Sequence, residues 1–370
     1  MLKKIRLLAL VSFGFCSLAQ SQNINSPYSR YGIGDLVPSQ NILTRGMGGI
    51  GAAYYDYSTV NFLNPASYAR LQATTFDFGL EVDNLALRTV TPPQKFSNAS
   101  PVISYLQIGI PLSKKGKWGM VFGLRPVSRI HYKIERRELL TGGTLNDSVQ
   151  TIFEGHGGSQ EVYWGTGIAL GHLTIGLNAG YLFGTKNFST HRNFINDSIL
   201  FYKANFTTSS NFGGLFLNAG VQYTIPLTKK AHLQLGAYGN WQQSLNASRD
   251  LVNETYDYSP NVGDYTIDSV YKETGVSGKL IMPASYGVGI MYSKLGRFLL
   301  GADYTASKWS QYRYFDSSDF VQDSWEIHFG GQIVPTGGKN YWSNVAYRAG
   351  FSFGRDYIKV DKDLPKWTFS

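Results

Sequence analysis

The chain has 370 residues, of which 15% are aromatic and 41 are Gly, and its formal net charge is +9. The only cysteine, Cys16, lies in the predicted leader, so the mature chain is expected to have no disulfide and no thiolate chemistry. The positive charge is scattered over turns and loops and forms no stripe, which argues against nucleic-acid binding and favours contact with anionic lipid head groups.

Residues 1–21 are predicted to be a signal peptide. Three basic residues precede the apolar run Leu7–Phe15, and Ala19 and Ser21 offer cleavage sites. The apolar run is too short to cross a bilayer as a helix, and no later segment is long and apolar enough to do so. The sequence therefore predicts an exported protein.

Residues 22–70 are rich in Gly, Ser and Asn and alternate poorly, so we expect an N-terminal hatch or plug. The run Gly46-Met47-Gly48-Gly49-Ile50-Gly51 matches the letters of the dinucleotide fingerprint. No apolar strand leads into this run and no βαβ unit surrounds it, which excludes a nucleotide site. Close packing of backbone in a plug explains the same glycines.

Residues 71–370 are predicted to form a transmembrane antiparallel β-barrel. The pattern is clearest in 215–225 and 232–240, where Leu215, Val221 and Leu235 alternate with polar residues or Gly, so one face is apolar. The predicted strands are Ala73–Val82, Val102–Leu112, Trp118–Tyr132, Tyr163–Leu170, Leu173–Phe183, Leu215–Ile225, Leu233–Asn240, Leu280–Tyr292, Phe298–Ala306, Ser324–Val334 and Val345–Gly354.

The connections between these strands alternate in length, with long polar loops expected at 84–100, 135–158, 185–210 and 246–278. Short periplasmic turns and long external loops are typical of outer-membrane barrels, so the N-terminus is placed on the periplasmic side. About eleven strands are an odd number for a closed bacterial barrel. Since Lys366–Ser370 resembles the start of a further strand, we expect a C-terminally truncated barrel that has about fourteen strands when complete.

Pro126 interrupts the third predicted strand. Proline cannot donate to a β-ladder, so it marks either a bulge near the rim or an inward bend that opens a gap in the wall. Catalytic and metal-binding patterns are absent: there is no Gly-x-Ser-x-Gly elbow, and the histidines lack ligand-type spacing. We therefore expect neither an enzyme nor a cofactor. The histidines are His131, His156, His172, His191, His232 and His328.

Several motifs, in this order, resemble the FadL/OmpP1/TodX-like family of outer-membrane transporters. Gly46–Ala53 followed by Asn64-Pro65-Ala66 resembles the hatch of that family. The later matches are Met282–Gly289, Gly301–Tyr304 with Lys308-Trp309-Ser310, and Tyr347–Phe351, whereas Ser26–Asp35 resembles a Bacteroidota-type branch. The resemblance implies a fourteen-stranded barrel, a hatch in the lumen, and a kinked third strand, where Pro126 lies, that gives a lateral exit.

The expected function is passive uptake of hydrophobic small molecules, fatty-acid-like or aromatic, across a Gram-negative outer membrane, whose lipid and lipopolysaccharide surround the barrel. An apolar pocket with a few polar groups is required for this. Its expected lining residues are Tyr54, Tyr55, Phe62, Leu63, Tyr105, Val121, Phe216 and Tyr238. The alternative is a non-transporting barrel that binds a type IX secretion partner through its loops, above all 246–278. An open diffusion porin disagrees with the plug.

Overall fold

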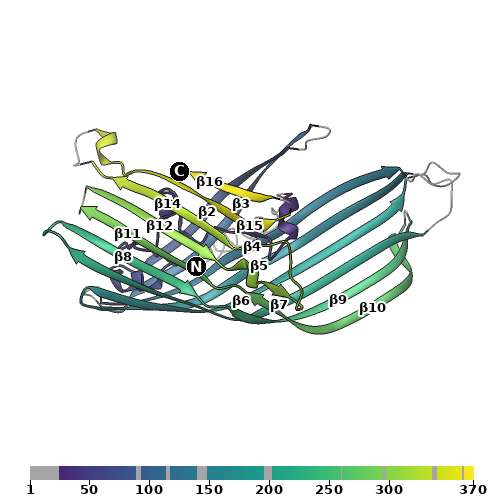
Figure 1. Cartoon of the computed structure of the whole chain (residues 1–370), viewed down its shortest axis with the longest axis horizontal. Coiled ribbons are helices and arrows are strands. Elements are labelled where there is room, and N and C mark those ends of the chain that lie inside the picture. Colours follow the sequence, from purple (N-terminus) through teal and green to yellow (C-terminus); the bar gives the residue numbers. More distant parts are fainter. Residues whose placement is uncertain are drawn as a thin grey trace, which may run out of the picture.

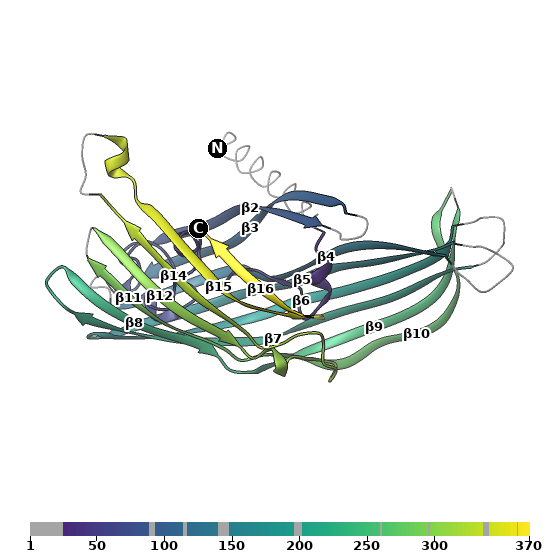
Figure 2. The ribbon, with the colours of Figure 1, turned by 45° about the horizontal axis from the view of Figure 1, so that its top comes forward.

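The computed structural model describes residues 25–88, 93–113, 117–139, 148–195, 202–259, 261–294, 297–335, 340–360 and 362–370. The predicted signal peptide lies outside these residues. Nearly all regular structure is antiparallel β-sheet, curved into the wall of a barrel (Figures 1 and 2). Among the described residues, no helix is both long and apolar enough to cross a membrane.

Neighbouring wall strands follow the sequence order except around β9 and β10: β8 pairs with β11, whereas β9 pairs with β7 and with β10. They are β2 (Thr75–Arg88), β3 (Lys95–Pro111), β4 (Trp118–Leu139), β5 (Ser148–Leu170), β6 (Leu173–Phe194), β7 (Lys203–Pro226), β8 (Ala231–Asn240), β9 (Gln243–Ser259), β10 (Gly263–Met282), β11 (Ser285–Lys294), β12 (Phe298–Ser307), β14 (Ser324–Ile333), β15 (Tyr347–Lys359) and β16 (Asp363–Phe369). The predicted fold class, an all-β antiparallel barrel with a plug, is confirmed, but the predicted count of about eleven strands is wrong, because the described residues contain fourteen wall strands.

The alternation also assigns the faces correctly where it is strong. In β4, the outward side chains Trp118, Phe122 and Leu124 are 48%, 46% and 39% exposed, whereas the inward Val121 is fully buried. Successive residues of a strand face opposite sides, so this pattern gives an apolar outer belt and an interior in contact with the plug.

The predicted long loops are wrong for most of their length. Much of 84–100, 135–158 and 185–210 continues the flanking strands, and 246–278 contains most of the hairpin β9–β10. These residues are polar on both faces, so sequence alternation misses them, but their backbones are paired across strands, as between Lys203–Gly213 of β7 and Asn246–Tyr256 of β9.

The predicted strand Leu280–Tyr292 is also wrong, because it is two strands. β10 ends at Met282 and β11 begins at Ser285, with Pro283 between them. Proline has no N–H to continue a ladder. β9 and β10 pair with each other in one part of the wall, whereas β11 pairs with β8 and β12 in the other. β16 contains the C-terminal residues that were predicted to begin a further strand.

Two segments fold into the lumen. The first is the plug, which contains η1 (Pro27–Arg30), β1 (Asp35–Leu36), α2 (Ile42–Arg45) and η2 (Pro65–Arg70). The second runs between β12 and β14 through η3 (Trp309–Gln311) and β13 (Arg313–Tyr314), and it buries Tyr312 completely. Lys186 of β6 donates to the Gly32 carbonyl at 2.7 Å, and the Tyr312 hydroxyl donates to it at 3.0 Å, so the two segments are tied together. The short helix η4 (Tyr341–Asn344) precedes β15.

Candidate functional site: plug, lumen and a parting in the wall

Asn64, in the predicted Asn-Pro-Ala motif, joins the plug to the wall. Its side-chain nitrogen donates to the carbonyl of Ala52 at 2.6 Å and to those of Val221 in β7 and Ala237 in β8 at 3.3 Å. Its side-chain oxygen accepts from the backbone N–H of Ala66 at 3.1 Å and caps η2, which begins at Pro65. Asn64, Pro65 and Ala66 are all buried. One side chain therefore orders the plug and attaches it to two strands.

The Gly-rich run lies against two further wall strands, β12 and β14. The Asp303 carboxylate of β12 accepts from the N–H groups of Gly51 at 2.6 Å and Ala52 at 2.7 Å. His328 of β14 contacts the Gly48 carbonyl through Nδ1 at 2.8 Å. Gly48 and Gly49 have φ of +68° and +86°, which L side chains rarely adopt. Gly46 follows α2 as its C-cap.

Glycines of the wall permit this close approach. A Cβ at Gly220 would overlap the side-chain oxygen of Asn64, and one at Gly236 would overlap the carbonyl of Ala52. Similar contacts with plug backbone occur along the sheet, at Gly119, Gly167, Gly176, Gly330 and Gly350. The plug is thus seated directly on strand backbone, which leaves little room for water between plug and wall.

Four of the predicted lining residues contribute to the plug's own packing. Tyr105 and Val121 pack with Phe62 and buried plug residues, and the Tyr105 hydroxyl accepts from the N–H of Ile42 at 3.2 Å. Tyr54 is buried beside Met47 and Met291, whereas the Tyr55 hydroxyl contacts His232 Nε2 at 3.2 Å. Burial raises the pKa of Tyr54 and Tyr55 above their usual range.

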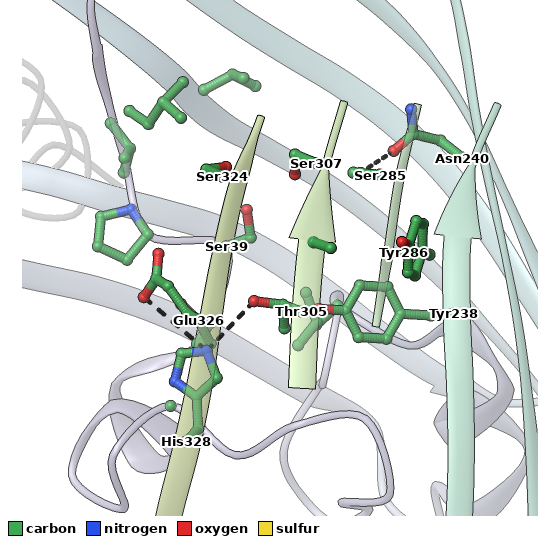
Figure 3. A pocket seen from close by; sticks show the side chains of 18 of the residues that line it. Ser39, Tyr238, Asn240, Ser285, Tyr286, Thr305, Ser307, Ser324, Glu326 and His328 are labelled. Carbon is green, nitrogen blue, oxygen red and sulfur yellow. Dashed lines mark hydrogen bonds and ion pairs between the residues drawn. The ribbon is translucent and has the colours of Figure 1, made fainter. Parts of the chain in front are cut away.

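The other four predicted residues surround a luminal cavity of about 350 Å³ between the plug and the wall. Its apolar surface comes from both, and includes Phe62, Leu63, Val127, Phe216, Tyr238, Met282 and Trp309. Figure 3 shows Tyr238, Tyr286 and Thr305 with the polar groups beside them. Some of those polar groups are paired: Ser285 donates to Asn240, and His328 Nε2 lies 3.9 Å from a carboxylate oxygen of Glu326. The cavity is therefore of mixed character, with apolar side chains from plug and wall and with polar side chains such as Ser307 and Ser324 among them.

The wall parts between β3 and β4, where Pro126 lies. These strands pair only between Leu106–Pro111 and Gly119–Leu124. Beyond that stretch, two irregularities occur: Ser104 is an extra residue of β3 opposite β2, and Val127 is an extra residue of β4 opposite β5. Bulges bend a strand and increase its twist, so the outer halves of β3 and β4 diverge (Figure 1).

The plug's N-terminal segment occupies the edge that β3 leaves. Asp35 and Leu36 of β1 pair with Arg129 and Ser128, and the Val37 N–H donates to the Val127 carbonyl at 3.0 Å. Further out, the Ser26 N–H donates to the His131 carbonyl at 2.9 Å. β4 therefore keeps a hydrogen-bonding partner, but this partner is part of the plug and not a wall strand.

A second cavity, of about 390 Å³, lies at this parting, and we call it the portal cavity. It is enclosed by β2, β3, β4 and the plug segment Asp35–Pro38. Two ion pairs connect β2 with the other side: Arg45 of the plug binds Glu81, and Arg129 of β4 binds Asp83 at 2.6 Å. Burial raises the pKa of the Asp35 carboxyl to about 6, and the nearby Asp356 adds to this, while Ser26 and Arg129 oppose it.

Sequence reasoning missed Asp303, Arg129 and the acids of β2 as site residues. A signal was available for all of them, since each is a charged residue inside an otherwise alternating strand, and such residues face the interior of a barrel. Their partners, however, lie far away in the chain, 252 residues for the bond between Asp303 and Gly51.

Comparison with known proteins agrees with this architecture. The model of the BamG family matches residues 1–364. No curated protein matches the sequence. Among solved structures, the CymD monoaromatic hydrocarbon channel has a TM-score of 0.52 and 17% identity, over 92% of this chain and 88% of that chain.

Two further structures are similar to a comparable extent. The toluene transporter TodX of Pseudomonas putida has a TM-score of 0.53 and 16% identity, over 90% of this chain and 88% of that chain. A FadL homologue of Pseudomonas aeruginosa has a TM-score of 0.51 and 11% identity, over 88% of this chain and 82% of that chain. At these identities the likeness shows the fold, which confirms the FadL-like architecture suggested by the motifs. The chain belongs to the BamG family and has the plugged β-barrel fold of the FadL-like channels.

Proposed function

We propose that this protein is an outer-membrane channel that takes up hydrophobic small molecules and releases them sideways into the bilayer through the parting between β3 and β4. The observation that carries the proposal is the pair of neighbouring cavities. The luminal cavity has apolar walls, and the portal cavity lies where the wall strands stop pairing.

The arrangement favours a sideways route over a straight one. The plug is hydrogen-bonded to β7, β8, β12 and β14, and its backbone rests on wall glycines, so the axial path is filled. In contrast, the two cavities share Leu36, Val37, Pro38 and Arg45 as lining residues, so only a thin layer of plug separates them. Apolar solutes gain free energy at each step from water to cavity to lipid, so no energy source is required.

The names of the similar structures support the class of ligand: they are a monoaromatic hydrocarbon channel, toluene transporters and a FadL homologue. The alternative, a barrel that binds a secretion partner, rested on a long polar loop at 246–278. That segment belongs mostly to the paired hairpin β9–β10, so we keep this alternative as an outcome of the test.

The test is native mass spectrometry of the full-length, detergent-purified protein incubated with perdeuterated toluene or palmitate. Phe216 lines the luminal cavity, whereas Phe206, ten residues earlier in the same strand, is 47% exposed and does not line that cavity. We expect Phe216→Ser to lower ligand occupancy about tenfold, because an aromatic side chain contributes about 1.5–3 kcal/mol of apolar contact. Phe206→Ser is the matched control. An empty wild-type barrel, or one that retains a large protein instead, would contradict uptake.

A further inference from the structure

The portal cavity contains ionisable side chains beyond the four that form its two ion pairs. Six such residues line it: Asp35, Arg45, Glu81, Asp83, Arg129 and His131. Arg45 is paired with Glu81 and Arg129 with Asp83. Within the described part of the chain, Asp35 forms no ion pair. Its carboxylate faces Ser26 and, at longer range, Asp356 and Arg129.

One donor of this cavity is also unsatisfied. The Nη2 atom of Arg129 is buried and has no hydrogen-bond partner among the described residues, although Nη1 of the same guanidinium binds Asp83. Asp35 and Arg129 lie directly opposite each other in the pairing of β1 with β4. Opposite residues of an antiparallel pair project from the same face, with Cβ atoms about 5 Å apart. Both residues line the portal cavity, so a guanidinium with an unused donor and a carboxylate with spare lone pairs lie opposite each other there.

The remaining surface of the portal cavity is mainly apolar and includes Leu36, Val37, Leu85, Val102 and Ile130, with the polar residues Asn84 and Ser100 among them. Its volume of about 390 Å³ is within the range of small-molecule sites. A ligand that fits must therefore have an apolar body and one small polar end that reaches Asp35 and Arg129.

The charges decide which polar end fits. A carboxylate end would meet Asp35, Glu81 and Asp83, and an ammonium end would leave the Nη2 hydrogens of Arg129 unpaired beside a second guanidinium. A hydroxyl both donates and accepts, so it can donate to Asp35 and accept from Arg129 without adding charge to a partly buried site. We propose that the portal cavity is a second ligand site, which binds the hydroxyl end of an apolar alcohol.

This inference rests on the proposed uptake function, because the portal cavity is the exit of that route. It narrows the substrate class at the exit to apolar molecules that carry a hydroxyl group, whereas the proposal for the luminal cavity concerns hydrophobic molecules in general. It also assigns Asp35 and Arg129 as residues that determine specificity at the exit.

The test uses photolabelling of the full chain in lipid nanodiscs. Four decyl probes carry the same alkyl diazirine and end in a hydroxyl, a methyl, an ammonium or a carboxylate group. Peptide mapping separates portal labelling, around Leu85, Val102 and Ile130, from luminal labelling, around Phe216 and Met282. We expect the hydroxyl probe to label the portal at least about fivefold more than any of the other three, which corresponds to about 1 kcal/mol.

Variants identify the residues responsible. Asp35→Ala and Arg129→Gln should each remove the preference for the hydroxyl probe and leave luminal labelling unchanged. Asp56→Asn is the control, since Asp56 lies outside the portal cavity and accepts hydrogen bonds from the N–H and the hydroxyl of Ser58. If Arg129→Gln does not fold, Arg129→Lys keeps the charge but loses the forked donor geometry and should also reduce the preference.

Two failures are distinguishable. Equal portal labelling by the hydroxyl and methyl probes, or stronger labelling by a charged probe, overturns the alcohol site while luminal labelling still supports uptake. An absence of luminal labelling by every probe overturns the proposed function itself.

Discussion

At the scale of single residues, the inward polar side chains of this barrel act mainly as attachment points for the plug. Asp303, His328 and Gln222 each bond plug backbone, the last through the carbonyls of Ala52 and Tyr54 at 3.1 and 3.0 Å. Asn64 does the same from the plug side. Buried backbone groups outside regular structure need such partners, and a plug with only short helical turns and one two-residue strand finds many of them in the wall.

Asn64→Ala is expected to loosen the plug and not to unfold the barrel. The substitution removes bonds to Ala52, Val221 and Ala237, worth about 1 kcal/mol each, and leaves buried carbonyls unpaired. Hydrogen exchange of residues 50–66 should accelerate at least about tenfold. Asn246→Ala, on an exposed position of β9, is the control. Unchanged exchange in Asn64→Ala would show that the motif does not hold the plug.

The seating of β1 against β4 is expected to strengthen as the pH falls. The folded-state pKa of Asp35, about 6, lies above its ordinary value of 3.8, so the seated form takes up a proton that the detached form does not yet hold. The stabilisation therefore grows as the pH drops through about 6 and is complete near the ordinary value. Exchange of residues 33–38, corrected for intrinsic rates, should be slower at about pH 5 than at about pH 7.5. Asp35→Asn should lose this dependence; the opposite trend in the wild type would refute the assignment.

At the scale of elements, the parting of β3 from β4 is produced by local irregularities in both strands. Ser104 bulges β3, Val127 bulges β4, and Pro101 and Pro126 lie within the diverging halves. Prolines and bulges are features with which natural sheets prevent edges from pairing. The divergence is stabilised by β1 on one side and by the two ion pairs to β2 on the other.

Pro126→Val should slow uptake several-fold, because a residue with an N–H and a high strand propensity at this position favours further pairing along β4. Pro365→Val in β16, which pairs with Arg355, is the matched control. Accumulation of perdeuterated toluene by cells that produce equal amounts of each variant is the measurement. An uptake rate equal to that of the wild type would remove Pro126 from the gate while leaving the luminal site intact.

At the scale of the whole molecule, the structure is a filled barrel. The plug and the segment 308–323 both enter the lumen, and they meet at Gly32. The Gly32 carbonyl accepts from Lys186 and Tyr312, and its N–H donates to Asp319. Two cavities of similar size lie beside the plug, and they share Leu36, Val37, Pro38 and Arg45 as lining residues. This differs from a water-filled pore, in which a polar interior is continuous from one side to the other.

The purified protein in planar bilayers is accordingly expected to show no stable ion conductance, because the plug fills the axial path. A general porin measured in the same bilayers is the positive control. Steady conductance that persists at low applied voltage would instead support an open diffusion channel and would contradict sideways release.

The sequence alone determined which face of each strong strand is apolar, that a plug precedes the barrel, and where a wall strand is irregular, next to Pro126. These properties depend on local alternation, on glycine content and on a missing N–H, all of which can be read along a short stretch of chain. Only the tertiary structure decided that β9 and β10 are strands, that Phe216 and Tyr238 face a cavity while Tyr105 and Val121 hold the plug, and that β1 covers the edge of β4. These outcomes depend on partners far away in the chain, such as Asp303 for Gly51. A polar or aromatic side chain that faces the lumen binds the backbone that lies opposite to it in the folded protein, and the local sequence does not specify that backbone.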